Sequence, residues 1–406
     1  MPTRTTRTPG LRTPASSAAL ARCVAPLEPE RFLDEYWERR PLVSERGGAA
    51  RFDDLLSERD IEELVASGAL RHPAFRLVKA GERLRLRDYS TDIPWRPSAF
   101  TGVADAAAVA EAFTAGATIV VQGLHHWWRP LAVFCRELEA ELGQPTQANA
   151  YWTPRDSQGL PVHHDTHDVF VLQVAGEKRW LVYEPKVELP LRDQRYADSM
   201  GEPGEPVHDV VLRAGDVLYM PRGWLHQAMT STTDSLHLTV GVNVYTWIDA
   251  ARAALRRAES NVEWRRSVPA DGEGGREVAE LLAEHMEPDD VVRRMRRRFV
   301  ASRRPLPEEP IAQLRALERL TADSEVERRP TVIAELLTRR DGLVLAFEGK
   351  TLGLPAAAGE ALEELVTAEG PVRPRDLPGD LDEESRLVLV RRLVREGFLR
   401  VADPGA

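Results

Sequence analysis

The stretch PVHHDTHDVFVLQVAGEKRW, residues 161–180, decides the fold of this chain. Its mainly apolar run, residues 169–174, has the length of a buried strand, and residues 175–176 (AG) indicate a turn into a return strand. His163 and Asp165 stand just before the run. Because residues i and i+2 of an extended segment point to the same face, we expect these two side chains to present one nitrogen and one oxygen to a common point.

A third candidate ligand lies downstream. Residues 214–216 (AGD) predict a turn, 217–220 (VLYM) a strand and 221–224 (PRGW) a second turn, after which His226 opens another strand. Two histidines and one carboxylate on one face leave the opposite positions open, which suits non-haem ferrous iron that binds oxygen and a co-substrate together. Lone His-x-Asp triplets are frequent in loops, so the prediction of a metal site depends on this turn–strand–turn–His continuation.

Further motifs surround these residues in a fixed order: NAYWTP at 149–154, SQG at 157–159 and GDVLYMPRGWLHQA at 215–228. Together with the His-x-Asp triplet they resemble the JmjC-type cupins of the ribosomal oxygenase group, which are iron- and 2-oxoglutarate-dependent protein hydroxylases. The similarity is densest over residues 147–245 and continues more loosely, but in order, from residue 27 to the C-terminus.

The resemblance implies roles for six side chains, four of which would bind the metal or the co-substrate. The iron ligands fall on His163, Asp165 and His226, and the basic residue that binds the far carboxylate of 2-oxoglutarate falls on Lys178, on the strand after the triplet. An ammonium in an apolar barrel is costly unless it is paired, and a dicarboxylate supplies the partner. The alternative is a Lys178 solvated at the turn.

The resemblance also places Asn149 and Tyr151 near the substrate. They lie two residues apart in an expected strand and so share one face. In the alternative interpretation, Asn149 satisfies a backbone group and Tyr151 packs in the core.

The other histidines near these motifs are not expected to bind metal. His164 lies between two ligands and points away if the segment is extended, and His167 is a packed or solvent-facing residue. His125 and His126 are neighbours whose side chains point apart, and His237 is expected to be a core or ladder residue.

Length and composition bound the class of protein. The chain has 406 residues, 43% hydrophobic and 29% charged, enough for two or three globular domains. Its net charge of −10 argues against a protein that coats nucleic acid, and we expect no direct nucleic-acid binding. Cys23 and Cys135 are too few for a disulfide framework and favour a reducing cytoplasm. No apolar run approaches the ~20 residues that span a bilayer.

We expect an α+β protein built around a double-stranded β-helix, the jelly roll of cupins and JmjC domains, with helices before it. The expected parts are a disordered tail (1–26), a JmjC or cupin catalytic domain (27–248), a helical region (249–304) and a winged-helix-like domain (311–406). The tail lacks acidic residues, so a transit peptide is the alternative there. The resemblance implies that the helical region forms a homodimer.

The C-terminal part is expected to hold a helix at 333–339, a strand at 343–347, helices at 358–368 and 383–396, and a closing strand at 398–401. Helix, helix, strand is the order of a winged helix, which the family also carries at this end. Its acidic residues favour a protein-contact module over a DNA-binding one.

Two more segments are candidates for contacts. Residues 191–206 are polar, with two glycines and two prolines, and predict a lid or substrate-binding loop between strands. Residues 289–304 carry seven arginines, which could face rRNA or an acidic partner. Nearby Glu and Asp favour a solvated, salt-bridged face instead.

The residues and the resemblance together predict an oxygenase that uses Fe(II), 2-oxoglutarate and O2 to hydroxylate a protein side chain, with a ribosomal protein as the expected substrate. Two alternatives stay open. One is the same chemistry on a peptide natural product or small molecule, and the other is a non-catalytic cupin scaffold. Hydroxylation and demethylation are not distinguished by the sequence.

Overall fold

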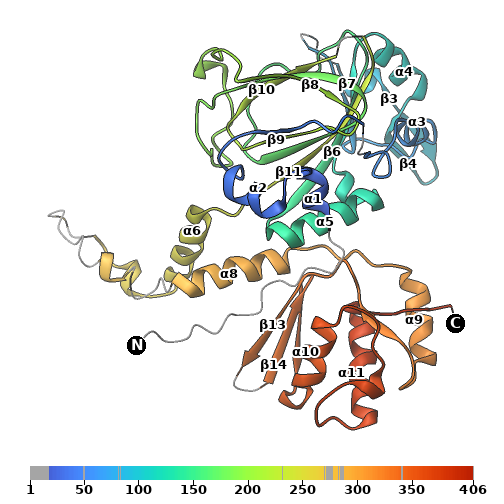
Figure 1. Cartoon of the computed structure of the whole chain (residues 1–406), viewed down its shortest axis with the longest axis vertical. Helices are drawn as coiled ribbons and strands as arrows, with labels where there is room; N and C mark the ends of the chain where they lie inside the picture. The colour runs from blue at the N-terminus through green and yellow to red at the C-terminus, as the bar shows by residue number, and fades with distance from the viewer. Residues whose placement is uncertain are drawn as a thin grey trace. The chain divides into compact units, whose positions relative to one another are not determined.

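The computed structural model describes residues 18–48, 51–80, 82, 84–230, 232–268, 270, 278–281, 283, 288–339 and 342–405. The chain divides into two compact units (Figure 1). Among the described residues, we call them the barrel unit, with residues 18–139 and 145–244, and the C-terminal unit, with residues 140–144 and 245–405. No helix among the described residues is long and apolar enough to cross a membrane. Most of the expected disordered tail lies outside the described residues.

The barrel unit is built on one nine-stranded sheet whose pairings are antiparallel. Neighbouring strands follow the order β1-β9-β7-β11-β6-β5-β2, and β8 and β10 also pair with β7. The strands are β1 (Leu42–Ser44), β2 (Phe75–Val78), β5 (Thr118–Val121), β6 (Thr146–Thr153), β7 (Asp168–Tyr183), β8 (His208–Arg213), β9 (Val217–Met220), β10 (Leu225–Met229) and β11 (Ser235–Val242). This large antiparallel sheet confirms the α+β class.

The central strand corrects one expectation. Residues 175–176 do not turn the chain back, and β7 runs unbroken for 16 residues. Gly176 adopts a φ of +62° close to a register shift in the pairing with β11, which falls between Ala175 and Gln173, and a Cβ on Gly176 would lie 1.7 Å from the carbonyl oxygen of Asp234. Glycine therefore permits a bend rather than a reversal. The first half of β7 pairs with β9 and β11 and the second half with β8 and β10.

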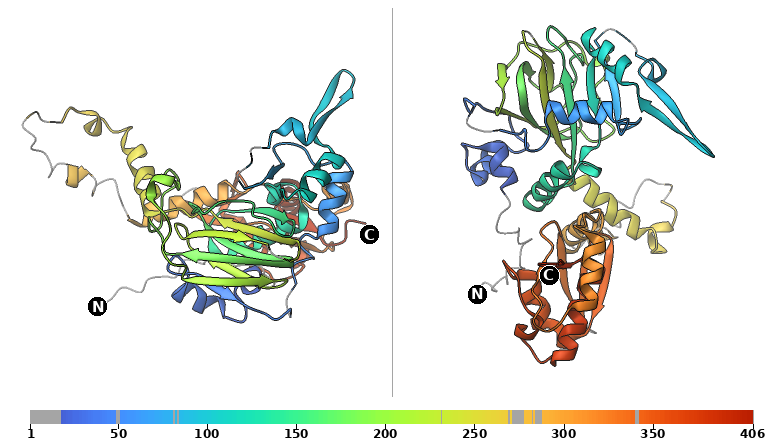
Figure 2. Two further views of the ribbon diagram at one scale, coloured as in Figure 1. Left: turned by 90° about the horizontal axis from the view of Figure 1, so that it is seen from above. Right: turned by 90° about the vertical axis from the view of Figure 1, so that its right-hand side faces the viewer.

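Helices and a hairpin complete the barrel unit. The helices are α1 (Ala19–Val24), α2 (Pro29–Glu35), α3 (Glu58–Ala66), α4 (Ala106–Thr114) and α5 (Arg129–Leu142), and the hairpin is β3 (Ser90–Trp95) with β4 (Ser98–Ala104). The hairpin forms its own two-stranded sheet and projects from the body of the unit (Figure 2).

The first two helices are anchored by buried apolar side chains. Helix α1 lies in residues assigned to the disordered tail, and this assignment was wrong for 19–24 because Leu20 and Val24 are buried. In α2, the ring of Phe32 packs edge-on against Tyr219, with ring centroids 4.8 Å apart, and at a tilt against Phe170, with centroids 5.7 Å apart. Helix α2 is thereby fixed to strands β7 and β9, next to the segments that carry the candidate ligands.

The C-terminal unit has its own apolar core of helices and short sheets. Its elements are α6 (Trp247–Ala258), α8 (Pro288–Ala301), α9 (Pro310–Arg319), β12 (Val326–Arg328), β13 (Ala334–Arg339), β14 (Gly342–Phe347), β15 (Lys350–Leu354), α10 (Gly359–Thr367), α11 (Glu383–Glu396) and β16 (Leu399–Val401).

The helix expected at residues 333–339 is instead strand β13. It pairs antiparallel with β14 and places Leu336 opposite Leu345. The residues of β13 are compatible with a helix, but an adjacent strand offers cross-strand pairing and burial that outweigh the local preference. The expected strand at 343–347, helices at 358–368 and 383–396 and closing strand at 398–401 are present as β14, α10, α11 and β16.

Candidate metal centre

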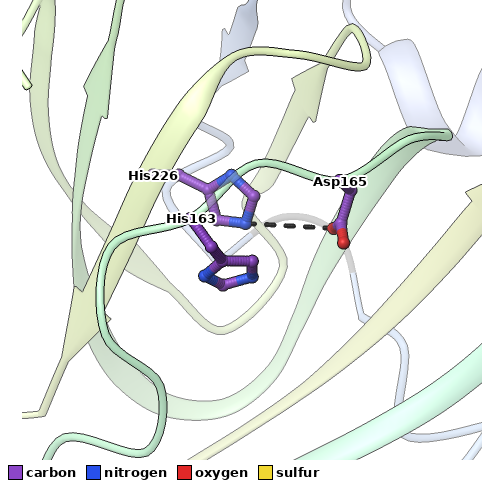
Figure 3. A group of neighbouring side chains, drawn as sticks. All are labelled: His163, Asp165 and His226. Atoms are coloured by element: carbon purple, nitrogen blue, oxygen red, sulfur yellow. Dashed lines mark ion pairs between the residues drawn. The ribbon is translucent and has the colours of Figure 1, made fainter. Parts of the chain in front are cut away.

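Three side chains of the barrel unit converge on one point (Figure 3). His163, Asp165 and His226 each offer one ligand atom, and these atoms all lie within 4.8 Å of one another. The Nε2 atom of His226 is 3.9 Å from Oδ2 of Asp165, and the two imidazole rings lie 4.5 Å apart between centroids. The convergence that the sequence predicted is present, and one ion could contact all three side chains.

The candidate ligands lie on two segments that are joined by backbone hydrogen bonds. His163 and Asp165 lie in the segment before β7 rather than in a regular strand, while His226 lies in β10. His163 and His226 exchange backbone hydrogen bonds, with N···O distances of 3.1 and 2.8 Å. The backbone N–H of Gly223 donates to the carbonyl of Asp165 at 3.0 Å. The isolated β-bridge between His163 and His226, rather than a continuous strand ladder, holds the two segments in register.

Hydrogen bonds also select the metal-binding nitrogen of each histidine. The Nδ1 atom of His163 lies 2.8 Å from the carbonyl oxygen of Pro161, and Nδ1 of His226 lies 3.1 Å from that of Trp224. A carbonyl only accepts, so each Nδ1 must carry the hydrogen, which leaves the Nε2 lone pair for a metal. Backbone partners of this kind fix tautomer and ring orientation in metal sites.

The protonation states of His226 and Asp165 favour the binding of a metal cation. Burial, and to a smaller extent the neighbouring His163, lower the pKa of His226 to about 4, so His226 is neutral at pH 7. Burial acts to raise the pKa of Asp165, but His167, His226 and the adjacent histidines outweigh it and the pKa is lowered. A neutral imidazole and an ionised carboxylate are the forms that bind metal.

The ligands open onto a cavity of about 270 Å³ that also holds Lys178. Lys178 is 5% exposed, and its Nζ donates to Oγ1 of Thr153 at 2.8 Å. No carboxylate in the described part of the chain forms an ion pair with it. Burial lowers the pKa of Lys178 to about 7. A buried ammonium beside a two-histidine, one-carboxylate set is what Fe(II) with an anionic co-substrate would require.

Lys178 reaches this position in a different way from the one expected. It lies on β7 itself, beyond the bend at Gly176, and not on a separate return strand. The position of Lys178 beside the ligands therefore depends on the bend at Gly176.

The two expected substrate-binding residues behave differently. Tyr151 lines the cavity, and burial raises its pKa to about 12, so it is a neutral phenol. Asn149 is not among the residues that line the cavity, and its Oδ1 accepts the backbone N–H of Gly123 at 3.0 Å. The structure thus shows the backbone contact left open as an alternative for Asn149.

Sequence reasoning missed His237, which it assigned to the core or ladder. His237 lies in β11, is buried, lines the cavity and stacks on Tyr151 with centroids 5.0 Å apart and planes 3° apart. Burial, and then the charge of Lys178, lower its pKa well below the usual value. The signal was available, because His237 and Thr239 alternate with Leu236 and Leu238, which indicates two faces.

The histidines beside the ligands point elsewhere. His164 is buried, its Nε2 lies 3.0 Å from the carbonyl oxygen of Gln194, and its ring contacts Tyr196. It faces the 191–206 segment, whose only regular element among the described residues is the short helix Asp198–Met200. His167 lies 3.4 Å from the amide nitrogen of Gln147. Neither belongs to the ligand group, as the sequence analysis expected.

A buried ion-pair network fixes the segments that carry the ligands. Arg222, in the turn before β10, pairs with Glu38 and, at 3.0 Å, with Asp168 at the start of β7. The other oxygen of Asp168 accepts from the backbone N–H of Arg222 at 3.2 Å and from the hydroxyl of Tyr219 at 3.3 Å. Asp168 is fully buried and Arg222 is 5% exposed.

Arg222→Leu should destabilise the barrel unit strongly, by about 3–5 kcal/mol, because it leaves Asp168 buried without its counter-charge. The matched control is Arg179→Leu, which breaks the exposed pair with Asp209 and should cost much less. Urea unfolding of both variants measures the difference. Equal losses would show that the buried pair is no more important than the exposed one.

The large antiparallel sheet and the His-x-Asp…His group agree with the JmjC or cupin fold that the sequence predicted. Residues 126–250 match the family model described as JmjC domain. The chain is a JmjC-domain protein related to the ribosomal oxygenases.

Curated ribosomal oxygenases are similar to this chain over part of their length. The chain is 33% identical over 257 residues to Ribosomal oxygenase 1 of Gallus gallus, covering 61% of this chain and 41% of that one. It is 32% identical over 225 residues to the bifunctional lysine-specific demethylase and histidyl-hydroxylase NO66 of Drosophila persimilis, covering 54% and 31%. The chain thus spans less than half the length of these curated relatives.

Solved structures show the same fold. The crystal structure of the Escherichia coli ribosomal oxygenase YcfD matches with a TM-score of 0.56 at 19% identity, covering 92% of this chain and 98% of that one. The structure of YcfD in complex with cobalt and 2-oxoglutarate matches with a TM-score of 0.54 at 20% identity, covering 93% and 99%.

Proposed function

We propose that this chain is an Fe(II)- and 2-oxoglutarate-dependent oxygenase that uses O2 to hydroxylate a protein side chain, with a ribosomal protein as substrate. The observation that carries the proposal is one cavity that holds both the ligand atoms of His163, Asp165 and His226 and the Lys178 ammonium, which forms no ion pair with a described carboxylate. The names of the relatives and of YcfD support the reaction and the substrate class.

Bound iron and 2-oxoglutarate would supply the oxidising chemistry, coupling decarboxylation of the co-substrate to oxidation of a nearby C–H bond. The protein's part is to bind and orient. The three ligands would occupy one face of the ion and leave the other open. Lys178 would pair with the far carboxylate, with Thr153 as its second partner. Tyr151 and the buried His237 form part of the cavity wall and would restrict water near the reacting atoms.

The proposal includes a homodimer formed through residues 249–304 and a protein-contact role for the winged-helix-like region. Trp247 is 80% exposed in α6, and Ile248 and Leu255 of the same helix are also exposed, which supports a partner surface there. Light scattering of the full chain would measure the protomer number, and the mass of a single protomer would refute the dimer.

Mass spectrometry of ribosomes from wild-type and deletion cells tests the substrate class. The expected result is a one-oxygen gain on a ribosomal protein that is present only in the wild type. In a parallel assay, the purified chain with Fe(II), 2-oxoglutarate and lysate should release succinate. An unchanged ribosome with succinate release would favour a small-molecule or natural-product substrate. Absence of both would favour the non-catalytic scaffold.

A further inference from the structure

The wall of the cavity holds a second positively charged side chain, besides Lys178, that the proposed chemistry does not use. Arg76 lies on the edge strand β2 and lines the cavity. The strand register places Arg76 opposite Val120, Val120 opposite Tyr151, and Tyr151 opposite His237. Residues opposite each other in a sheet share a face, so these four side chains form one row across the inner surface.

The guanidinium of Arg76 is held in place without being neutralised. Its Nε donates to Oε1 of Gln122 at 2.8 Å, and Nε2 of Gln122 donates to the carbonyl of Pro73 at 2.7 Å. No carboxylate in the described part of the chain pairs with Arg76. A neutral amide therefore orients the side chain while its positive charge remains available, and this charge acts to lower the pKa of the Tyr151 phenol.

The charges around the cavity do not suit a cationic guest. Of the described residues that line it, Asp165 alone carries a carboxylate, and Asp165 belongs to the metal ligand group. Lys178 is matched by the far carboxylate of 2-oxoglutarate in the proposed function. Arg76 then remains as an unmatched cation, and a second cation beside it would meet like-charge repulsion in a partly desolvated space.

We infer that Arg76 is a specificity-determining residue that admits neutral or anionic target side chains and rejects arginine and lysine, including methylated lysine. The inference rests on the proposed function, since it concerns the side chain presented to the same metal centre. The free guanidinium N–H groups donate to an acceptor on the target, such as a carbonyl, carboxylate or unprotonated ring nitrogen.

A peptide-binding experiment tests this inference without turnover. The full chain is loaded with Mn(II) and 2-oxoglutarate under anaerobic conditions. It is applied to a set of immobilised synthetic peptides. Each peptide carries one of the amino acids at its central position and a random mixture of residues on both sides. The amount of protein retained is measured for each central residue. The proteins compared are wild type, Arg76→Glu, Arg76→Lys and Arg71→Gln. Arg71 is a matched control because it packs over the ring of Phe100 and does not line the cavity.

Wild type, Arg76→Lys and Arg71→Gln should bind Arg- and Lys-centred peptides at least about tenfold more weakly than neutral or acidic ones. Arg76→Glu should reverse this order. A wild type that favours cationic centres or shows no dependence on the centre would overturn the inference, as would an Arg76→Glu that keeps the wild-type order. If Arg76→Glu does not fold by thermal melting, Arg76→Met replaces it and should lose the discrimination.

Two binding measurements separate this inference from the proposed function. Calorimetric titration of the Mn(II)-loaded protein with 2-oxoglutarate should give the same affinity for Arg76→Met and wild type. A large loss in the variant would assign Arg76 to the co-substrate and overturn the inference while leaving the proposed function intact. A wild type that binds neither Mn(II) nor 2-oxoglutarate would refute the proposed function and the inference with it.

Discussion

Asp165→Ala should lose the bound metal and all 2-oxoglutarate turnover. The side chain supplies the only carboxylate among the three converging ligands, and the two imidazoles that remain carry no negative charge to offset that of a divalent ion. Even partners that only orient a ligand change metal affinity by about 10–100-fold, so removal of a ligand should cost at least about a hundredfold. Calorimetric titration with Mn(II) under anaerobic conditions measures the affinity, and succinate release measures turnover.

Asp209→Ala is the matched control for this variant. Asp209 is an exposed carboxylate on β8 of the same unit, paired with Arg179. It should keep wild-type metal affinity. Retention of tight Mn(II) binding by Asp165→Ala, with an unchanged melting profile, would show that the metal ligands had been assigned wrongly.

Lys178→Met should keep the metal and lose 2-oxoglutarate. Methionine fills a similar volume but offers no charge to the far carboxylate, whose remaining partner at this position would be the Thr153 hydroxyl. A charged pair that is desolvated costs about 2–5 kcal/mol when one member is removed, which is roughly a 30-fold to several-thousand-fold loss of affinity. Titration of the Mn(II)-loaded variant with 2-oxoglutarate measures it. Lys79→Met, at the surface pair with Glu82, should bind like wild type.

The same variant should show a pH-dependent gain in stability when no ligand is present. Burial lowers the pKa of Lys178 to about 7, whereas an unfolded lysine has a pKa of about 10.4. Between these values the unfolded chain holds the proton and the folded chain does not. The cost of burying the ammonium is therefore fully present below about pH 7 and fades as the pH rises toward about 10.4.

We expect Lys178→Met to raise the free energy of unfolding by roughly a few kcal/mol near pH 6 and by clearly less near pH 9. Urea unfolding at both values measures the difference, with Lys79→Met as the control for loss of a surface lysine. A gain of the same size at both pH values would mean that the ammonium is not destabilised by burial.

The candidate ligands were accessible from sequence because their signals are local or periodic. A His-x-Asp triplet before an apolar run and a histidine after a turn–strand–turn each follow from short stretches. The positions of His163, Asp165 and His226 in the structure agree with that prediction. The buried location of Lys178 agrees with it as well, although the strand that carries it was predicted wrongly.

Other features were decided by partners distant in the chain. Whether Gly176 turns or bends the chain depends on the strands on either side of it, and only the neighbouring β14 makes residues 334–339 a strand. Asn149 bonds to Gly123 because β6 passes that loop. These outcomes follow from pairing and burial, which local composition does not contain.

By itself, the sequence determined the ligand types, their order and most of the strands, since strand periodicity and turn residues act over a few neighbouring positions. Only the tertiary structure decided which side chains line the cavity. Arg76 and His237 enter it through cross-strand register, and Arg222 reaches Asp168 through the meeting of two turns. The physical reason is that register and burial are set by contacts between strands, whereas periodicity is set along a single one.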